Sequence, residues 1–308
     1  MKIVFAAPSL DAQLWLPELN RALPDADIQV DGQQPDGWLA DYALVWLPAA
    51  GFFSSQPQLK GIVNLGAGVD KLLAQADFPR QVPLMKLRDA GMGALILDYV
   101  RYGLLHFGRD FDRYRADQRA LVWQPLELNN PLKRKVTVLG TGAIGQTVAN
   151  GLVADGYTVR SWGRSSKHIE GVEVFAGQAA LADCLADTDV LVNLLPCTQE
   201  TQGLIQQKQL QLLNRGAVVI SAGRGEIFSE LALVQGLESG QLRGALLDVF
   251  EQEPLPANSP LWRMDNVLVT PHIAGPTLID GAVEQVSDYL LKLEAGVSVP
   301  CVDVETGY

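Results

Sequence analysis

The chain has 308 residues, of which 48% are hydrophobic and 19% charged, an ordinary composition for a globular protein of about two domains. Its 24 lysines and arginines stand against 35 aspartates and glutamates, and no basic block stands out. A nucleic-acid partner is therefore disfavoured, because phosphate contacts need clustered positive charge. No apolar run approaches the roughly 20 residues that span a bilayer, so we expect no membrane anchor, and the opening residues resemble a buried strand rather than a signal peptide.

The cysteines and histidines lack the pattern of a disulfide framework or a metal site. The three cysteines are widely spaced and form no C-x-x-C pair, which is typical of a chain in a reducing cytoplasm. The three histidines are scattered, without the close ligand spacing that zinc requires. We therefore expect a cytoplasmic protein without a bound metal. These residues are Cys184, Cys197, Cys301, His106, His168 and His272.

The first hundred residues alternate short apolar runs with helix-like or turn-rich stretches. This alternation predicts βαβ units and a parallel sheet. Residues 94–116 then lack proline and place apolar side chains at helical spacing, which predicts one long helix that links two domains. The expected strands are 2–7, 27–30, 43–47, 61–65 and 83–87.

A polar, proline-containing stretch follows at 123–131, and a second alternating series begins after it. Its apolar runs are numerous enough for a complete doubly wound sheet. Residues 280–296 end the pattern with an amphipathic helix. The expected strands are 136–140, 158–162, 171–175, 190–195, 217–222, 244–250 and 267–272.

The strongest local motif is a buried strand from Val136 that runs into G-x-G-x-x-G and then into a helix. Gly140 permits the tight turn, Gly142 lets the backbone approach a pyrophosphate, and Gly145 lets the helix pack on its strand. The N–H groups at the start of the helix, around Ala143 and Ile144, face the anion. A strand before, a helix after and a second strand beyond are all present, so the motif predicts a dinucleotide site.

The end of the second strand indicates which dinucleotide binds. An acid about 20 residues after the glycines would hold the ribose 2′-hydroxyl of NAD, but Gly163 stands near that place. A cationic, hydroxyl-rich turn follows, with Arg164, Ser165 and Lys167. A guanidinium can bind a 2′-phosphate through two hydrogen bonds, and no carboxylate is present to repel it. We therefore predict NADP(H); the alternative is that these cations are solvated surface charges.

Three further segments of the second half lie at predicted strand ends, where an open α/β sheet binds its ligands. They are 221–225, 244–254 and 269–275, and they contain an arginine, carboxylates and a histidine. These groups can reduce a 2-keto acid: the arginine holds the carboxylate and polarises the keto oxygen, and the histidine gives a proton to the developing alkoxide. A carboxylate would orient the imidazole and favour its charged form.

These segments, together with several others, make the chain similar to the D-isomer-specific 2-hydroxyacid dehydrogenases, and most of all to the bacterial NADP-dependent glyoxylate/hydroxypyruvate reductases of that family. The resemblance implies that Arg224 binds the substrate, that His272 is the general acid/base and that Glu253 is its partner. Asp248 is implied to contact the nicotinamide carboxamide, and the cofactor also passes Leu195 and Pro196. The other matching segments are 65–70, 89–93, 140–145, 194–198, 247–254 and 270–272.

The same resemblance implies that backbone amides of Ala67 and Gly68 bind the substrate carboxylate, and glycines do let main-chain N–H groups approach an anion. The alternative there is a tight strand-to-helix turn without a ligand. Trp46 and Trp123 are candidates to wall a small pocket, although such aromatics are more often plain core or interface residues.

The fold that the resemblance implies is α/β, with two Rossmann-like or flavodoxin-like domains, parallel sheets and an active-site cleft between them. Residues 1–98 and 276–308 would form the substrate-binding domain, and residues 99–275 the NADP-binding Rossmann domain. The implied reaction is NADPH-dependent reduction of glyoxylate to glycolate and of hydroxypyruvate to D-glycerate. Family members are usually homodimers, and residues 117–131 are a candidate exchanged arm. The alternatives are a reductase of a larger 2-keto acid and a non-catalytic redox sensor or corepressor.

Overall fold

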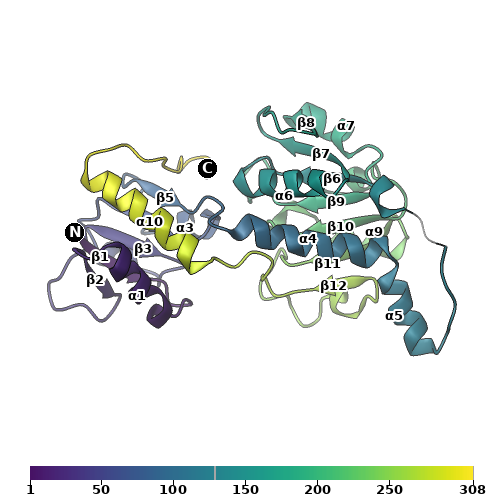
Figure 1. The fold of residues 1–308 in the computed structure, drawn as a ribbon. Helices are drawn as coiled ribbons and strands as arrows, with labels where there is room; N and C mark the ends of the chain where they lie inside the picture. Colours follow the sequence, from purple (N-terminus) through teal and green to yellow (C-terminus); the bar gives the residue numbers. More distant parts are fainter. Residues whose placement is uncertain (128–129, 308) are drawn as a thin grey trace. The chain divides into compact units, whose positions relative to one another are not determined.

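The computed structural model describes residues 1–127 and 130–307, and the chain divides into two compact units (Figure 1). One unit combines Met1–Gly91 with Thr277–Tyr308, and the other is Met92–Pro276. Each has its own parallel sheet and its own hydrophobic core. The predicted α/β class with two parallel sheets is confirmed.

The first unit is built on five parallel strands in the order β2-β1-β3-β4-β5. The three central strands are buried on both faces, which explains why they appear in the sequence as continuous apolar runs. The C-terminal helix packs against the first helix of this unit, so the chain returns to the sheet on which it began. The elements are β1 (Lys2–Ala6), α1 (Ala12–Ala22), β2 (Asp27–Val30), β3 (Tyr42–Val45), α2 (Phe52–Ser55), β4 (Gly61–Asn64), α3 (Asp70–Leu73), β5 (Leu84–Lys86) and α10 (Ile279–Glu294).

The second unit carries seven parallel strands in the order β12-β11-β10-β9-β6-β7-β8, the number expected from the sequence. The strand order reverses between β6 and β9, the position at which open α/β sheets bind their ligands. The strands are β6 (Lys135–Leu139), β7 (Thr158–Gly163), β8 (Val172–Ala176), β9 (Val190–Asn193), β10 (Ala217–Ser221), β11 (Leu242–Leu247) and β12 (Val267–Val269).

Helices cover both faces of this sheet (Figure 1). Among them α4 packs along α6 so closely that a Cβ on Gly151 would lie 2.9 Å from Cδ1 of Leu97. This packing makes α4 part of the second unit from its first residue, so the unit begins a little before the boundary expected from the sequence. The helices are α4 (Met92–Gly108), α5 (Phe111–Ala120), α6 (Ala143–Ala154), α7 (Leu181–Leu185), α8 (Gln207–Leu210) and α9 (Glu230–Glu238).

The single long helix predicted over 94–116 is wrong, because the chain breaks between α4 and α5. Asp110 adopts a left-handed conformation with φ 58°, which a continuous right-handed helix cannot contain. Its carboxylate lies 2.7 Å from the guanidinium of Arg243, which also contacts Asp112 at 2.6 Å. The ion pairs that hold the break come from a strand more than a hundred residues away, so no local pattern announces them.

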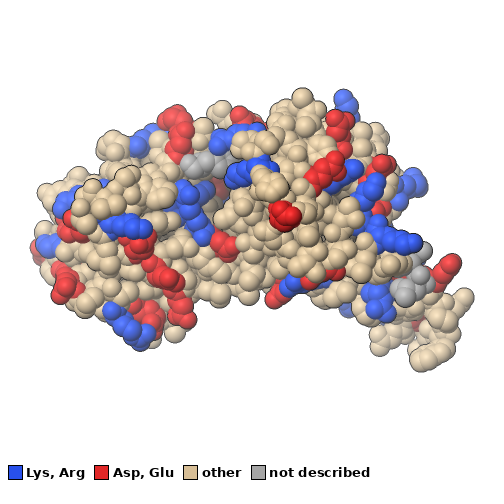
Figure 2. All heavy atoms as spheres, turned by 45° about the horizontal axis from the view of Figure 1, so that its top comes forward, with Lys and Arg blue, Asp and Glu red and all other residues tan. Residues whose placement is uncertain are grey.

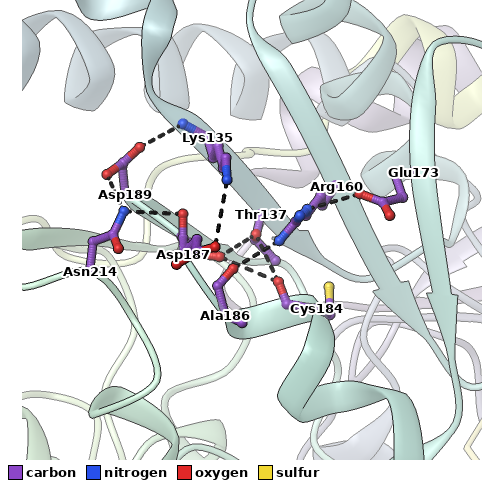
Figure 3. Close-up of polar contacts among 10 residues, drawn as sticks. Lys135, Thr137, Arg160, Glu173, Cys184, Ala186, Asp187, Asp189 and Asn214 are labelled. Carbon is purple, nitrogen blue, oxygen red and sulfur yellow. Dashed lines mark hydrogen bonds and ion pairs between the residues drawn. The ribbon is translucent and has the colours of Figure 1, made fainter.

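A polar network ties the strands together near their amino ends (Figure 3). The Arg160 guanidinium donates to Glu173 at 2.9 Å and to the carbonyl of Ala186 at 2.8 Å. The backbone N–H of Lys135 donates to Asp189 at 2.8 Å. These bonds connect β6, β7, β8 and the turn before β9, and they stabilise the amino end of the sheet. The candidate site lies at the opposite edge, at the carboxyl ends of the strands.

Figure 2 shows acidic and basic side chains intermingled on the face that it displays. Within residues 1–127 and 130–307, no helix is both long and apolar enough to cross a membrane.

Candidate active site

The candidate residues of the second unit follow the carboxyl ends of its strands. Because every strand of the sheet runs in the same direction, these residues lie along the same edge of the sheet. The strand order separates them into two groups. Residues after β10, β11 and β12 supply acid–base groups and an arginine, residues after β6 and β7 form the glycine-rich turn and the cationic turn, and β9 lies between. In sheet order they are His272, Asp248 with Glu253, Arg224, Leu195, Gly140–Gly145 and Arg164.

The structure brings His272 and Glu253 into contact. Nδ1 of the imidazole lies 3.0 Å from Oε2 of the carboxylate. The His272 side chain is 44% exposed and that of Glu253 is 21% exposed. The imidazole is therefore accessible to a ligand, while the carboxylate is mostly covered by the protein. Because Nδ1 is committed to the carboxylate, Nε2 is the nitrogen that can exchange a proton with a ligand.

His272 sits in a strained loop that Asp248 organises. The φ of His272 is 56°, in the left-handed region that side chains other than glycine rarely adopt. The buried carboxylate of Asp248 accepts hydrogen bonds from the N–H groups of Ile273 and Ala274, both at 2.8 Å, and from the hydroxyl of Thr270 at 2.6 Å. The carbonyl of Asp248 accepts the N–H of His272 at 3.0 Å. One aspartate therefore holds the backbone on both sides of the catalytic candidate.

This organising role of Asp248 was not among the expectations, since the resemblance implied only a cofactor contact for that residue. A second residue also escaped notice: the Tyr99 hydroxyl, on α4, lies 2.6 Å from that of Thr270. Burial raises the pKa of Tyr99, so its hydroxyl stays protonated and can take part in this network as a neutral group. The available sequence signal was an aspartate directly after the apolar run 244–247, and its link to the Thr270 segment, 22 residues later, was not visible in the sequence.

Arg224 is held between two backbone segments by the glycines on either side of it. A Cβ on Gly223 would lie 2.6 Å from the carbonyl oxygen of Leu195, and one on Gly225 would overlap the backbone of Phe250. Asn193 at the end of β9 donates to the carbonyl of Arg224 at 3.1 Å. Glycine at both flanks is thus required by packing, and it fixes where the arginine leaves the sheet.

The glycine-rich turn has the geometry that its motif predicts. Gly140 has φ 120° and lies against the backbone of Leu194, and a Cβ on Gly145 would lie 2.8 Å from the carbonyl carbon of Gly140. A Cβ on Gly142 would have no neighbour within 4 Å, so the turn is open on that side. Helix α6 begins directly after Gly142 without a side-chain cap, which leaves its first N–H groups to an anion.

The cationic turn after β7 lies against the glycine-rich turn. Nζ of Lys167 donates to the carbonyl of Thr141 at 3.0 Å, so this ammonium sits beside the motif rather than apart from it. Arg164 and Ser165 are exposed at the end of the strand. His168 is also exposed, and its imidazole pairs with Glu170 at 3.3 Å.

The segment after β9 completes the set. The backbone N–H of the buried Leu195 donates to Oδ1 of Asn193 at 3.1 Å, and the carbonyl of Pro196 accepts the Thr201 hydroxyl at 2.7 Å. Cys197 follows on the same segment and is partly buried. Asn193 therefore links this segment to Arg224, a connection that sequence reasoning missed.

In the first unit, the predicted carboxylate loop follows β4. The buried Asn64 uses its side-chain amide to bind the carbonyls of Gly66 and Gly68, each at 2.9 Å. Both carbonyls are thereby turned toward Asn64, and in the described residues the N–H groups of Ala67 and Gly68 have no acceptor. This arrangement is suited to an anion, and Asn64 was not among the expected residues.

Trp46 directly follows β3, on the neighbouring strand, and its ring packs against this loop. A Cβ on Gly66 would lie 2.7 Å from Cη2 of the indole, so the ring packs directly against the glycine. The indole is only partly buried. Trp123, by contrast, is fully exposed in the second unit and packs into no core of its own chain.

Comparison with known proteins decides the family. The model for the "D-isomer specific 2-hydroxyacid dehydrogenase, NAD binding domain" matches residues 102–274. The chain belongs to the D-isomer specific 2-hydroxyacid dehydrogenases. The match begins within α4 and ends in the His272 loop, so it covers every candidate residue of the second unit.

Members of this family resemble the chain over its whole length. It is 40% identical to a glyoxylate/hydroxypyruvate reductase A of Yersinia enterocolitica and 42% identical to one of Serratia proteamaculans, with 100% of both chains covered in each case. A D-isomer specific 2-hydroxyacid dehydrogenase of Xanthobacter autotrophicus, solved with NADPH and MES, has a TM-score of 0.95 and 40% identity over 100% of this chain and 99% of that one. An NADPH-dependent glyoxylate/hydroxypyruvate reductase of Sinorhizobium meliloti, solved with NADP and sulfate, has a TM-score of 0.93 and 33% identity over the same shares.

Proposed function

We propose that the protein catalyses NADPH-dependent reduction of glyoxylate to glycolate and of hydroxypyruvate to D-glycerate. The observation that carries the proposal is the contact of 3.0 Å between His272 and Glu253, in a family whose full-length relatives bear the name of this activity. An imidazole with one nitrogen bound to a carboxylate and the other open is suited to deliver a proton to an alkoxide.

The residues present fit NADP(H). The open side of Gly142 and the uncapped start of α6, at Ala143 and Ile144, suit a pyrophosphate. Lys167 beside the turn and the neighbouring Arg164 suit a 2′-phosphate, since a guanidinium and an ammonium both bind phosphate oxygens. When bound, the coenzyme supplies the hydride that is added to C2 of the substrate.

The substrate carboxylate is assigned to Arg224 and to the amides of Ala67 and Gly68. A guanidinium fixes a carboxylate through two parallel hydrogen bonds and polarises a neighbouring keto oxygen. The amides are aligned by Asn64, and Trp46, whose ring packs against Gly66 from the end of β3, limits the space for the rest of the substrate. A small 2-keto acid matches this combination.

His272 donates the proton to the alkoxide oxygen as it develops. Glu253 keeps the imidazole oriented and stabilises its positive charge before the transfer. Asp248 keeps the loop in place throughout, because its hydrogen bonds hold the backbone next to His272. We also assign Asp248, Leu195 and Pro196 to the cofactor side of the site, at the ends of β11 and β9.

Two other functions remain as competitors. A reductase of a larger 2-keto acid would use the same catalytic residues with a wider pocket. A redox sensor or corepressor would bind the dinucleotide without turnover, but nothing in that role requires Arg224, Glu253 and His272 together. The intact set favours an enzyme.

We further propose a homodimer that forms through the second unit, in a cytoplasmic setting. Helix α5 and residues 121–123 after it expose apolar side chains, and α5 has no buried residue of its own. Burial of these side chains by a second copy would remove apolar surface from water. Residues 128–129 of the expected arm 117–131 lie outside the described residues. The exposed side chains are Phe111, Leu121, Val122 and Trp123. Sedimentation as a monomer at micromolar concentration would contradict the dimer.

Initial-rate oxidation of NADPH and of NADH tests the function, with glyoxylate, hydroxypyruvate, pyruvate and a bulky aromatic 2-keto acid. We expect NADPH-linked turnover of the first two substrates to exceed all other combinations. Preference for the bulky acid would select the larger-substrate reductase. Tight NADPH binding without turnover of any of the four would select the sensor. The His272→Ala variant is the matched control for background oxidation.

A further inference from the structure

One side chain of the glycine-rich turn closes off the position at the end of β7. Gly163 is buried there, near the place where an acid would hold the ribose hydroxyl of NAD. A Cβ on Gly163 would overlap Oγ1 of Thr141 and would lie 3.1 Å from its Cγ2 and 3.2 Å from its Cβ. The whole Thr141 side chain thus occupies the space that any side chain at 163 would need.

The strand side of this contact is fixed by hydrogen bonds. The carbonyl of Gly163 accepts the N–H of Gly177 at 3.0 Å, and Gly163 pairs with Ala176 in the sheet. The N–H of Gly140 donates to the carbonyl of Trp162 at 2.8 Å, which ties the turn to β7. The two backbones therefore cannot separate without breaking sheet bonds.

The turn side is fixed as well. The carbonyl of Thr141 accepts Nε2 of Gln146 at 2.9 Å and Nζ of Lys167 at 3.0 Å. Thr141 is only 6% exposed, and its β-branched side chain has two heavy γ atoms. A rotation about χ1 would relieve the contact only by turning the Cβ hydrogen of Thr141 toward Gly163. Both γ atoms would then need space elsewhere in a buried, closely packed turn.

We propose that Thr141 is a specificity-determining residue for the coenzyme. Because the Thr141 side chain fills the space beside β7, only glycine fits at position 163. An aspartate, whose carboxylate would select NADH and repel a 2′-phosphate, therefore cannot be accommodated there. The ammonium of Lys167 has three donors, so its bond to Thr141 leaves others for a phosphate. The proposal rests on the proposed function for the identity of the coenzyme, and it adds a steric cause for that choice.

The test measures the Kd of NADPH and of NADH by quenching of tryptophan fluorescence, without substrate, together with the thermal midpoint of each variant. Gly163→Ala introduces only a Cβ, and Gly163→Asp adds the carboxylate. Each is made alone and with Thr141→Ala, which leaves only the Thr141 Cβ position at 3.2 Å. Thr141→Ala alone is the matched control for loss of the threonine.

We expect Gly163→Ala to lower the thermal midpoint and to weaken the binding of both coenzymes at least about tenfold, and the addition of Thr141→Ala to reverse both changes. The variant with Thr141→Ala and Gly163→Asp should bind NADH at least about tenfold more tightly than Gly163→Asp does, and NADPH about tenfold more weakly than the unchanged protein. If Gly163→Asp does not fold, recovery of a folded, NADH-binding protein on addition of Thr141→Ala supports the proposal, and failure to recover contradicts it.

Equal NADH affinity of Gly163→Asp with and without Thr141→Ala would overturn the proposal, as would a Gly163→Ala variant with unchanged midpoint and affinities. Equal affinity of the unchanged protein for NADPH and NADH would instead overturn the coenzyme assignment. The two failures are distinguishable, because the thermal midpoints of Gly163→Ala, Thr141→Ala and the double variant measure the steric contact without any coenzyme.

Discussion

The hydroxyl of Thr270 donates to the carboxylate of Asp248 at 2.6 Å, and through this bond the loop that carries His272 is attached to the end of β11. Oδ2 of the same carboxylate accepts the N–H of Ala274, and Oδ1 also accepts that of Ile273. Hydrogen bonds to a charged group are among the stronger ones in proteins, and here they stabilise a histidine with a left-handed backbone.

Asp248→Asn is expected to misplace His272. The amide nitrogen would face a backbone donor where an oxygen now accepts, so stability should fall by about 2 kcal/mol and kcat by roughly a hundredfold. Thermal unfolding and steady-state kinetics check this. Tyr99→Phe is the matched control, because it removes only the outermost hydroxyl and should change kcat far less. An Asp248→Asn variant with unchanged kcat would contradict the organising role.

His272→Ala is expected to lower the rate of reduction by roughly 10²- to 10⁴-fold, the range typical of a lost general acid. The Kd of NADPH should stay near that of the unchanged protein, since His272 lies at the end of β12 and the glycine-rich turn follows β6. Glu253→Gln keeps a hydrogen-bonding oxygen but removes the charge, so it should lower kcat by a smaller factor. Near-normal turnover by His272→Ala would refute the mechanism.

Two glycines of the dinucleotide turn should respond differently to alanine. Gly142→Ala should cost less than about 1 kcal/mol of stability, because its φ is −72° and its side is open, yet it should weaken NADPH binding by obstructing the approach of the pyrophosphate. Gly145→Ala should cost about 1–3 kcal/mol or more, because its Cβ would overlap the carbonyl of Gly140. Thermal unfolding and NADPH titration of both variants make the comparison. Similar losses of stability in the two would contradict it.

Asn64→Ala is expected to raise the KM for glyoxylate with little change in the Kd of NADPH. The substitution removes both donors that hold the carbonyls of Gly66 and Gly68, so the loop loses its alignment, at a cost of about 1–3 kcal/mol of stability. Initial rates over a range of glyoxylate concentrations provide the measurement. An unchanged KM would show that the loop amides do not hold the substrate.

Cys184 is expected to resist alkylation in the native protein. Burial raises the pKa of its thiol to about 12, so at pH 8 the reactive thiolate is almost absent, and its fraction rises only as the pH approaches that value. Treatment with iodoacetamide at pH 8 and mass spectrometry check this, with the urea-unfolded protein as control. Equal labelling of Cys184 in the native and unfolded protein would contradict the burial.

Much of the fold was predictable because its signals are local. Apolar runs such as 61–64 and 190–193 correspond to fully buried strands, and the spacing of Val283, Val286 and Leu290 matches the buried face of α10. The break after α4 was not predictable, because Asp110 is held by Arg243 from a distant strand.

The sequence by itself determined the family resemblance, the glycine-rich turn and the choice of His272 and Glu253 as acid–base candidates, because motifs of fixed spacing specify backbone turns and the side chains next to them. Only the tertiary structure decided that Asp248 holds the His272 loop, that Asn64 aligns the carbonyls of Gly66 and Gly68, and that Thr141 fills the space beside Gly163. The contacts of Asp248 and of Thr141 join segments from different strands and turns, and their partners are chosen by packing, whereas Asn64 bonds residues only two and four positions away, in a conformation that the folded loop decides. The physical reason is that backbone conformation and proximity in space are set by the folded chain, and spacing along the sequence does not encode them.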